Sequence, residues 1–133
     1  MVVSEAARPA PNPGVLRWLE DQAVLDLAIS VLTLGEIARG VARMAEGRRK
    51  RALQKWLSLE LPEQFDGRLL PVDGNVALAW GALTSQGDDM GRPLPVTDGL
   101  LLATAQVHGL TMVTRNIGDV DGRGVTVLNP YQI

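Results

Sequence analysis

The 133-residue chain contains no cysteine and a single histidine, His108. Without cysteine the chain can form neither disulfide bonds nor thiolate metal sites. Any metal ion that it binds must therefore be held by oxygen ligands or by His108. A chain without cysteine also suits a reducing compartment, so we expect a cytoplasmic location.

Long apolar runs are missing as well. No run approaches the ~20 residues that a membrane-spanning helix needs. The first residues carry no basic segment followed by an apolar core, so they do not resemble a signal peptide. A length of 133 residues with 46% hydrophobic residues is typical of one globular domain, and we expect residues 1–133 to form it.

The net charge of −2 gives no strong bias of either sign, but the basic residues are unevenly placed. Four of them form a basic cluster of adjacent residues: Arg48, Arg49, Lys50 and Arg51. The cluster opens a predicted helix, where positive charge is unfavourable by a few tenths of a kcal/mol. This mild conflict favours a role other than stability. A solvated helix face is the commoner explanation of such a cluster, and contact with phosphate or with a protein partner is the functional one.

Segments of strand length alternate with segments of helical periodicity. Short apolar runs predict strands at residues 27–29, 68–72, 110–114 and 125–128. Apolar spacing predicts helices at residues 12–19, 31–45, 48–61, 74–86 and 97–108. Pro62 is expected to end or interrupt the third of these helices, and residues 116–124 are expected to form a loop. The alternation predicts an α/β fold with a parallel sheet covered by helices on both faces.

Three acidic residues fall near the carboxyl ends of predicted strands, where parallel sheets bind their ligands. They are Glu36, Asp98 and Asp119. Carboxylates that meet from separate elements repel one another unless a cation lies among them, and Mg²⁺ is a hard ion suited to oxygen ligands. Such an ion can activate water and stabilise charge on a phosphoryl group, so we hypothesise that the three carboxylates converge on one.

Each of these residues also has a purely structural interpretation. Thr33 and Glu36 have the spacing of a capping box, in which Glu36 would only bond a backbone N–H. Asp98 in a first helical turn is stabilised by the helix dipole, and Asp119 is an ordinary residue of a Gly-rich turn. His108 suits the carbonyl end of its helix and is not expected to be catalytic.

Three stretches of the chain resemble the acidic motifs of PIN domains. Residues 29–40 (ISVLTLGEIARG) resemble the second motif, residues 91–105 (GRPLPVTDGLLLATA) the third, and residues 108–120 (HGLTMVTRNIGDV) the fourth. The closing residues 124–130 (GVTVLNP) resemble the last strand of FitB-like VapC toxins. The motifs follow one another in the family's order and cover almost the whole chain.

The resemblance implies a PIN-like three-layer α/β/α fold and a metal-dependent endoribonuclease of a type II (VapBC) toxin–antitoxin system. It implies that Glu36, Asp98 and Asp119 are catalytic and hold Mg²⁺ or Mn²⁺, with Thr114 and Asn116 in supporting positions. RNA would be the substrate, a VapB-type antitoxin the partner, and a homodimer the assembly. The basic cluster would contact the RNA or the partner.

The sequence differs from the family pattern at its N-terminus. PIN domains open with an apolar strand ending in Asp-Thr-Asn, and Met1 falls where that motif should finish. We therefore expect the central strand to be missing or truncated, either because the true start lies upstream or because the chain is a decayed member. The second case predicts a PIN-like module that binds antitoxin or RNA without cleaving it. A nucleotide-binding α/β protein is a further alternative, but no Gly-rich phosphate loop joins a strand to a helix here.

Overall fold

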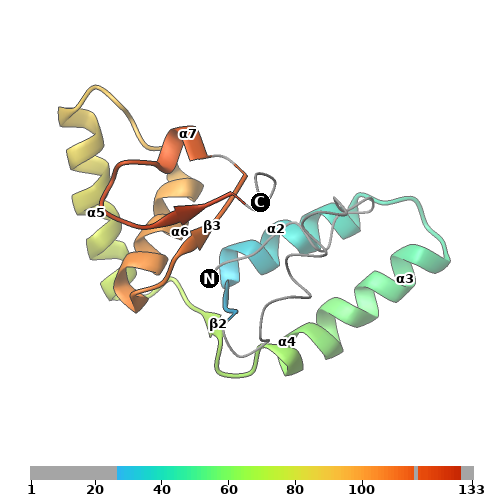
Figure 1. Ribbon diagram of the computed structural model, residues 1–133. Coiled ribbons are helices and arrows are strands. Elements are labelled where there is room, and N and C mark those ends of the chain that lie inside the picture. The colour runs from blue at the N-terminus through green and yellow to red at the C-terminus, as the bar shows by residue number, and fades with distance from the viewer. Residues whose placement is uncertain (1–26, 116, 130–133) are drawn as a thin grey trace.

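The computed structural model describes residues 27–115 and 117–129, so the helix predicted at residues 12–19 lies outside the described residues. Figure 1 shows the arrangement of the elements. In chain order they are β1 (Ile29–Ser30), α2 (Val31–Ala42), α3 (Arg48–Lys55), a π-helical segment η3 (Trp56–Glu60), α4 (Leu61–Gln64), β2 (Leu69–Leu70), α5 (Gly74–Asp89), α6 (Val96–His108), β3 (Met112–Val113), α7 (Ile117–Val120) and β4 (Val127–Leu128). No helix in the described ranges has the length and apolar character needed to cross a membrane.

The strands pair in parallel, as the alternation of elements predicts. Strand β1 pairs with β2, with Ile29 opposite Leu69, and β3 pairs with β4, with Met112 opposite Val127. Within the described residues the two pairs are separate two-stranded sheets with no strand between them. The mixed, parallel architecture confirms the predicted α/β class.

The main hydrophobic core lies between α5, α6 and the β3–β4 sheet. Its buried members are Val76, Leu83, Leu94, Leu102, Ala103, Ala105, Met112 and Val120. Figure 1 shows these elements together on one side of the molecule, while α3 and α4 extend on the far side of α2. We call residues 74–129 the C-terminal region and residues 31–64 the α2–α4 region.

Close packing of α5 against α6 depends on a glycine. A Cβ added to Gly99 would lie 3.0 Å from the indole of Trp80 and 3.1 Å from Leu94. The absence of a side chain at Gly99 therefore lets the first turn of α6 approach α5, and this approach fixes the position of the neighbouring Asp98.

The predicted loop at residues 116–124 contains a short helix, α7, and the prediction of a loop throughout was wrong. The backbone N–H of Asp121 donates to the carbonyl of Ile117 at 2.8 Å, which closes the turn. Val120 is fully buried in the main core. Burial of this one apolar side chain orders a segment whose glycines favour a loop, because tertiary packing outweighs weak local propensity.

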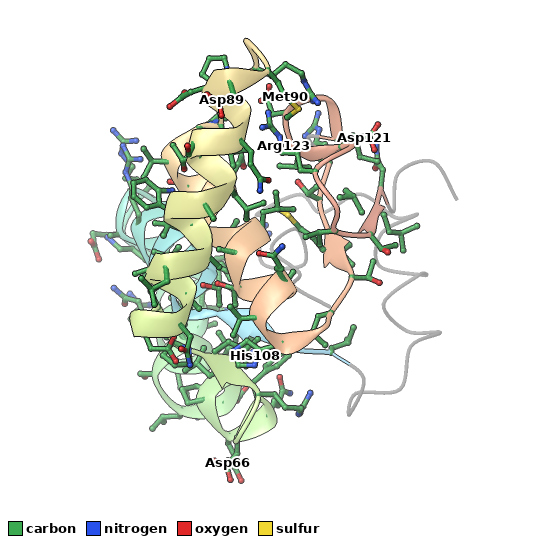
Figure 2. The ribbon with its side chains drawn as sticks, turned by 90° about the vertical axis from the view of Figure 1, so that its left-hand side faces the viewer. Asp66, Asp89, Met90, His108, Asp121 and Arg123 are labelled. Atoms are coloured by element: carbon green, nitrogen blue, oxygen red, sulfur yellow. The ribbon has the colours of Figure 1, made fainter. Side chains whose placement is uncertain are left out.

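Two arginines tie this segment to the end of α5. Arg92 donates from its guanidinium to the carbonyls of Gly118 and Asp121, both at 3.1 Å. Arg123 is buried and donates to the carbonyls of Asp119 at 2.9 Å and Arg92 at 3.0 Å. Figure 2 shows Arg123 beside the end of α5 that carries Asp89, with His108 farther down the molecule and Asp66 at its lower end. The two guanidiniums thus donate hydrogen bonds to carbonyls of these loops, a role that backbone N–H groups have in helices and sheets.

Pro62 interrupts the predicted helix without ending it. The helical path runs on through Pro62 to Gln64, and the preceding turn, η3, widens to a π-helix. There the N–H of Leu61 donates to the carbonyl of Trp56, five residues back. Proline has no N–H and its ring clashes with the carbonyl four residues before it, so a wider turn accommodates it.

Candidate active site

Glu36 lies in the second turn of α2, a helix that begins at the end of strand β1. Ser30 caps this helix, because its hydroxyl accepts a hydrogen bond from the N–H of Leu32 at 3.0 Å. The capping-box interpretation of Thr33 and Glu36 is therefore wrong: Thr33 lies inside the helix and is fully buried. Glu36 is exposed and has no capping role in α2.

Glu36 lines an open pocket of about 420 Å³ together with Arg39, Gly40, Arg43 and Thr97. Arg39, Gly40 and the C-cap Arg43 follow Glu36 by three, four and seven positions, so all four share one face of α2 and its C-terminal end. Thr97 comes from the first turn of α6, far away in the sequence. Glu36 and the start of α6 therefore lie on the same side of the molecule, as the hypothesis of converging carboxylates requires.

Asp98 follows Thr97 in the first turn of α6 and is half-buried. No side chain caps this helix, which starts directly after Pro95. A carboxylate in the first turn interacts favourably with the positive end of the helix dipole. Asp98 is thus held next to the pocket by a helix whose position is set through Gly99 and Trp80.

Asp119 is exposed on α7, and its backbone carbonyl accepts the hydrogen bond from Arg123. Thr114 follows strand β3, and its N–H donates to the carbonyl of Leu128 at 3.0 Å. Asn116 lies outside the described residues. The supporting roles of Thr114 and Asn116 and the metal role of Asp119 stay predictions.

The predicted donor set fits a hard divalent cation in its chemistry, because every candidate ligand is a carboxylate. Within residues 27–115 and 117–129, however, no three acidic or histidine side chains gather closely enough to hold a metal ion. Mg²⁺ commonly uses only one or two protein carboxylates and keeps several waters. A site built on Glu36 and Asp98 therefore remains chemically reasonable, and the full three-carboxylate site stays a prediction.

The basic cluster Arg48–Arg51 opens α3 and contains one residue with a clear structural role. Lys50 is only 7% exposed, and its ammonium donates to the carbonyl of Ala42 at 3.2 Å and to the carboxylate of Glu46. It thereby satisfies a carbonyl at the end of α2. This engagement leaves the other three members, which are exposed, as candidate contacts for RNA or a partner.

The sequence patterns did not indicate Arg43 as a functional candidate. Arg39 appeared only within residues 29–40, the stretch that resembles the second acidic motif. The signal that identifies both is helical spacing, because positions three and seven after Glu36 must share its face. The sequence could not show that this face borders a pocket that Thr97 of α6 also lines.

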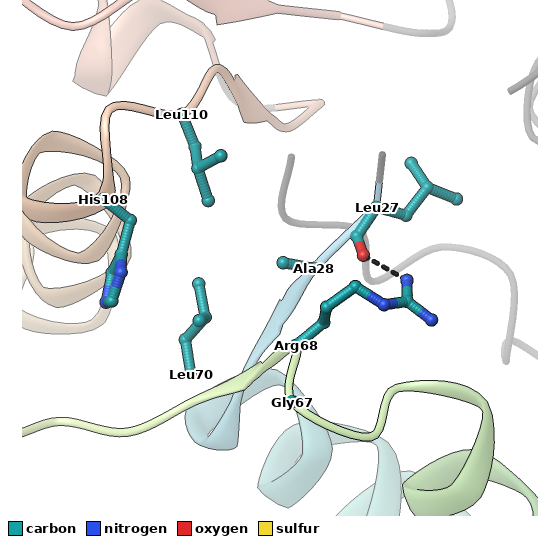
Figure 3. A pocket seen from close by; sticks show the side chains of 7 residues that line it. All are labelled: Leu27, Ala28, Gly67, Arg68, Leu70, His108 and Leu110. Atoms are coloured by element: carbon teal, nitrogen blue, oxygen red, sulfur yellow. Dashed lines mark hydrogen bonds between the residues drawn. The ribbon is translucent and has the colours of Figure 1, made fainter. Parts of the chain in front are cut away.

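A second pocket, of about 240 Å³, lies at the other edge of the strands (Figure 3). It is lined by Leu27, Ala28, Gly67, Arg68, Leu70, His108 and Leu110. Most of these residues come just before β1, β2 or β3, so the pocket borders the amino ends of the strands. None of these described lining residues carries a carboxylate, and the guanidinium of Arg68 is bonded to the carbonyl of Leu27. These residues therefore offer no ligands for the predicted metal chemistry.

The family model described as "PIN domain" matches residues 2–118. The chain belongs to the PIN-domain family. This assignment confirms the resemblance inferred from the three acidic motifs.

Two curated relatives align with nearly the full length of the chain. The chain is 35% identical to Toxin FitB of Neisseria gonorrhoeae over 98% of its own length and 94% of the relative. It is 30% identical to VapC ribonuclease Y4jK of Sinorhizobium fredii, with the same coverage. Both relatives carry names of the toxin type predicted from the sequence.

Solved structures of PIN-domain toxins have the same fold. The crystal structure of FitAcB from Neisseria gonorrhoeae superimposes with a TM-score of 0.89 at 35% identity, covering 98% of this chain and 94% of that one. A toxin–antitoxin complex from Klebsiella pneumoniae superimposes with a TM-score of 0.69 at 26% identity, covering 92% and 88%. The predicted PIN-like α/β fold is confirmed.

Proposed function

We propose that this protein is a metal-dependent endoribonuclease and the toxin of a VapBC-type toxin–antitoxin system. The observation that carries the proposal is the pocket shared by Glu36 and Thr97, next to Asp98, in a chain of the PIN-domain family. Relatives named as a toxin and as a VapC ribonuclease support the same activity.

Glu36 and Asp98 would hold Mg²⁺ or Mn²⁺ through their carboxylate oxygens, and Asp119 would contribute directly or through water. A bound divalent ion supplies a Lewis acid for the scissile phosphate and an activated water as nucleophile. Thr114 and Asn116 would orient these groups by hydrogen bonding. The packing of α6 against α5 at Gly99 supports the proposed role of Asp98, because it would hold this ligand in a fixed position.

The proposal is tested by replacing Asp98 with asparagine, which keeps the size of the side chain and removes its charge. Cleavage of single-stranded RNA in Mg²⁺ should fall about a hundredfold or more, since a metal ion contributes several kcal/mol to transition-state stabilisation. Addition of EDTA should abolish cleavage by the unmodified protein. A gel-based assay of labelled RNA measures both effects.

Asp88→Asn is the matched control, because Asp88 is an exposed aspartate in the last turn of α5. It should cleave RNA like the unmodified protein. Equal cleavage by Asp98→Asn and the control would refute the assignment of the site.

A second candidate function is a PIN-like module that binds RNA or an antitoxin without cleaving it. The observation that favours it is the lack of three gathered acidic side chains in the described residues. Under this alternative, the unmodified protein binds single-stranded RNA but leaves it intact in both Mg²⁺ and Mn²⁺.

We also propose a VapB-type antitoxin as partner, because a solved structure similar to this chain is a toxin–antitoxin complex. A homodimer and a cytoplasmic location belong to the same proposal. The absence of cysteine and of any spanning helix in the described part of the chain is compatible with that location.

A further inference from the structure

Arg39 and Arg43 differ from the arginines that stabilise the fold. Arg68, Arg92 and Arg123 each donate to backbone carbonyls, so their donors are used inside the protein. Arg39 and Arg43 are exposed on α2, and neither guanidinium forms a hydrogen bond or ion pair with any described residue. Their donors remain available to a ligand.

Both side chains line the pocket that contains Glu36 and Thr97. Gly40 lies between them on the same face, and a Cβ added there would meet no atom within 4 Å. The space over Gly40 is therefore open, and the Cα atoms of Arg39 and Arg43 lie about one helical turn apart, roughly 6 Å along the axis. Together with Glu36 they give the pocket a net positive charge beside a carboxylate.

We propose that Arg39 and Arg43 bind phosphates of the RNA strand and hold the strand in the pocket beside Glu36, an inference that rests on the RNA substrate of the proposed function. Guanidinium groups bind phosphate through two parallel hydrogen bonds. A nucleic acid strand carries a phosphate at every nucleotide, so two cations one turn apart can each find a partner on one strand. Thr97, which also lines the pocket, carries a hydroxyl that can donate a further hydrogen bond.

This arrangement separates two tasks within one pocket. Glu36 takes part in the proposed metal chemistry, while the two arginines bind the phosphates of the RNA substrate. Phosphate contacts fix the register of a strand without reading its bases. Arg39 and Arg43 should therefore contribute to binding of any single-stranded RNA.

The test is binding of an oligouridylate of about ten nucleotides in EDTA, where cleavage cannot interfere. Arg39→Gln and Arg43→Gln should each bind about tenfold more weakly than the unmodified protein. Each should also reduce the slope of log K against log salt by about 0.7, the value for one phosphate contact on a single strand. Fluorescence anisotropy at several salt concentrations gives both quantities.

Lys55→Gln is the matched control, because Lys55 is an exposed cation in the last turn of α3 and lies outside the pocket. Its affinity and salt slope should equal those of the unmodified protein. Arg39→Lys should keep the salt slope but recover only part of the affinity, since an ammonium cannot form the two parallel bonds. Unchanged circular dichroism would show that α2 is intact in every variant.

The inference is overturned if the unmodified protein does not bind the oligouridylate, or if both arginine variants retain its affinity and salt slope. Variants that bind RNA normally but lose binding to a polyglutamate peptide would assign the arginines to an acidic protein instead. The outcome is independent of catalysis: weakened binding by the arginine variants supports the inference even if Asp98→Asn leaves cleavage unchanged.

Discussion

The C-terminal region and the α2–α4 region use the same residue types for different purposes. In the C-terminal region, eight buried apolar residues form one core, and the guanidiniums of Arg92 and Arg123 donate hydrogen bonds to backbone carbonyls. In α2, only Thr33 and Val41 are buried, and two arginines face an open pocket. The first region maintains the shape of the molecule, and the second presents charged groups to a ligand.

The two regions meet at the candidate active site. Asp98 comes from a helix fixed in the core, whereas Glu36 comes from the exposed face of α2. A rigid element positions a functional group more accurately than a loop does, because packing locks its rotamer and its backbone. The comparison therefore predicts that changes in the buried core of the C-terminal region act on stability and that changes on the exposed face of α2 act on binding.

The largest effect on stability should come from Leu102→Ala. Leu102 is 0% exposed and belongs to the main core, so its truncation leaves a cavity. We expect a loss of about 2–5 kcal/mol in the free energy of unfolding. Leu59→Ala is the control in the α2–α4 region, because Leu59 is 60% exposed and its truncation should change stability by less than about 0.5 kcal/mol. Urea denaturation followed by circular dichroism measures both, and equal losses would remove the distinction between the regions.

A smaller effect should follow from Arg123→Met, which keeps the length of the side chain and removes its donors. The carbonyls of Asp119 and Arg92 would lose their partner inside the C-terminal region. We expect destabilisation by about 1–3 kcal/mol. Arg39→Met should be nearly neutral in the same denaturation experiment, because the guanidinium of Arg39 has no partner among the described residues. If Arg39→Met destabilised the protein as much as Arg123→Met, a structural role for Arg39 would replace the proposed one.

The smallest effect should be that of Asp73→Ala. The carboxylate of Asp73 accepts a hydrogen bond from the N–H of Val76 at 3.0 Å and caps α5. Loss of an N-cap costs about 1 kcal/mol. Asp73→Ser should restore most of this stability, because a serine hydroxyl can accept the same bond. Thermal unfolding of the three proteins checks the ranking, and no change in Asp73→Ala would show that the cap is dispensable.

Local patterns in the sequence predicted most of the secondary structure within the described residues. The helices predicted at residues 74–86 and 97–108 start within one residue of α5 and α6, which are bounded by the N-cap Asp73 and by Gly109, whose φ of 64° lies in the left-handed region. Both are short-range effects of backbone geometry and hydrogen bonding, so neighbouring residues suffice to specify them. The short helix α7 was not predicted, because Val120 is buried only through contacts made by the tertiary structure.

Sequence alone determined the family, the order of the acidic motifs and the identity of Glu36, Asp98 and Asp119 as candidate ligands. The sequence could not distinguish an arginine that donates to the protein's own carbonyls from one that faces a pocket. The residue type is the same in both cases, and only the surroundings differ. Only the tertiary structure decided that Lys50 caps α2, and that Arg39 and Arg43 line a pocket together with Thr97. The physical reason is that the function of a long charged side chain depends on which donors and acceptors the fold brings within its reach.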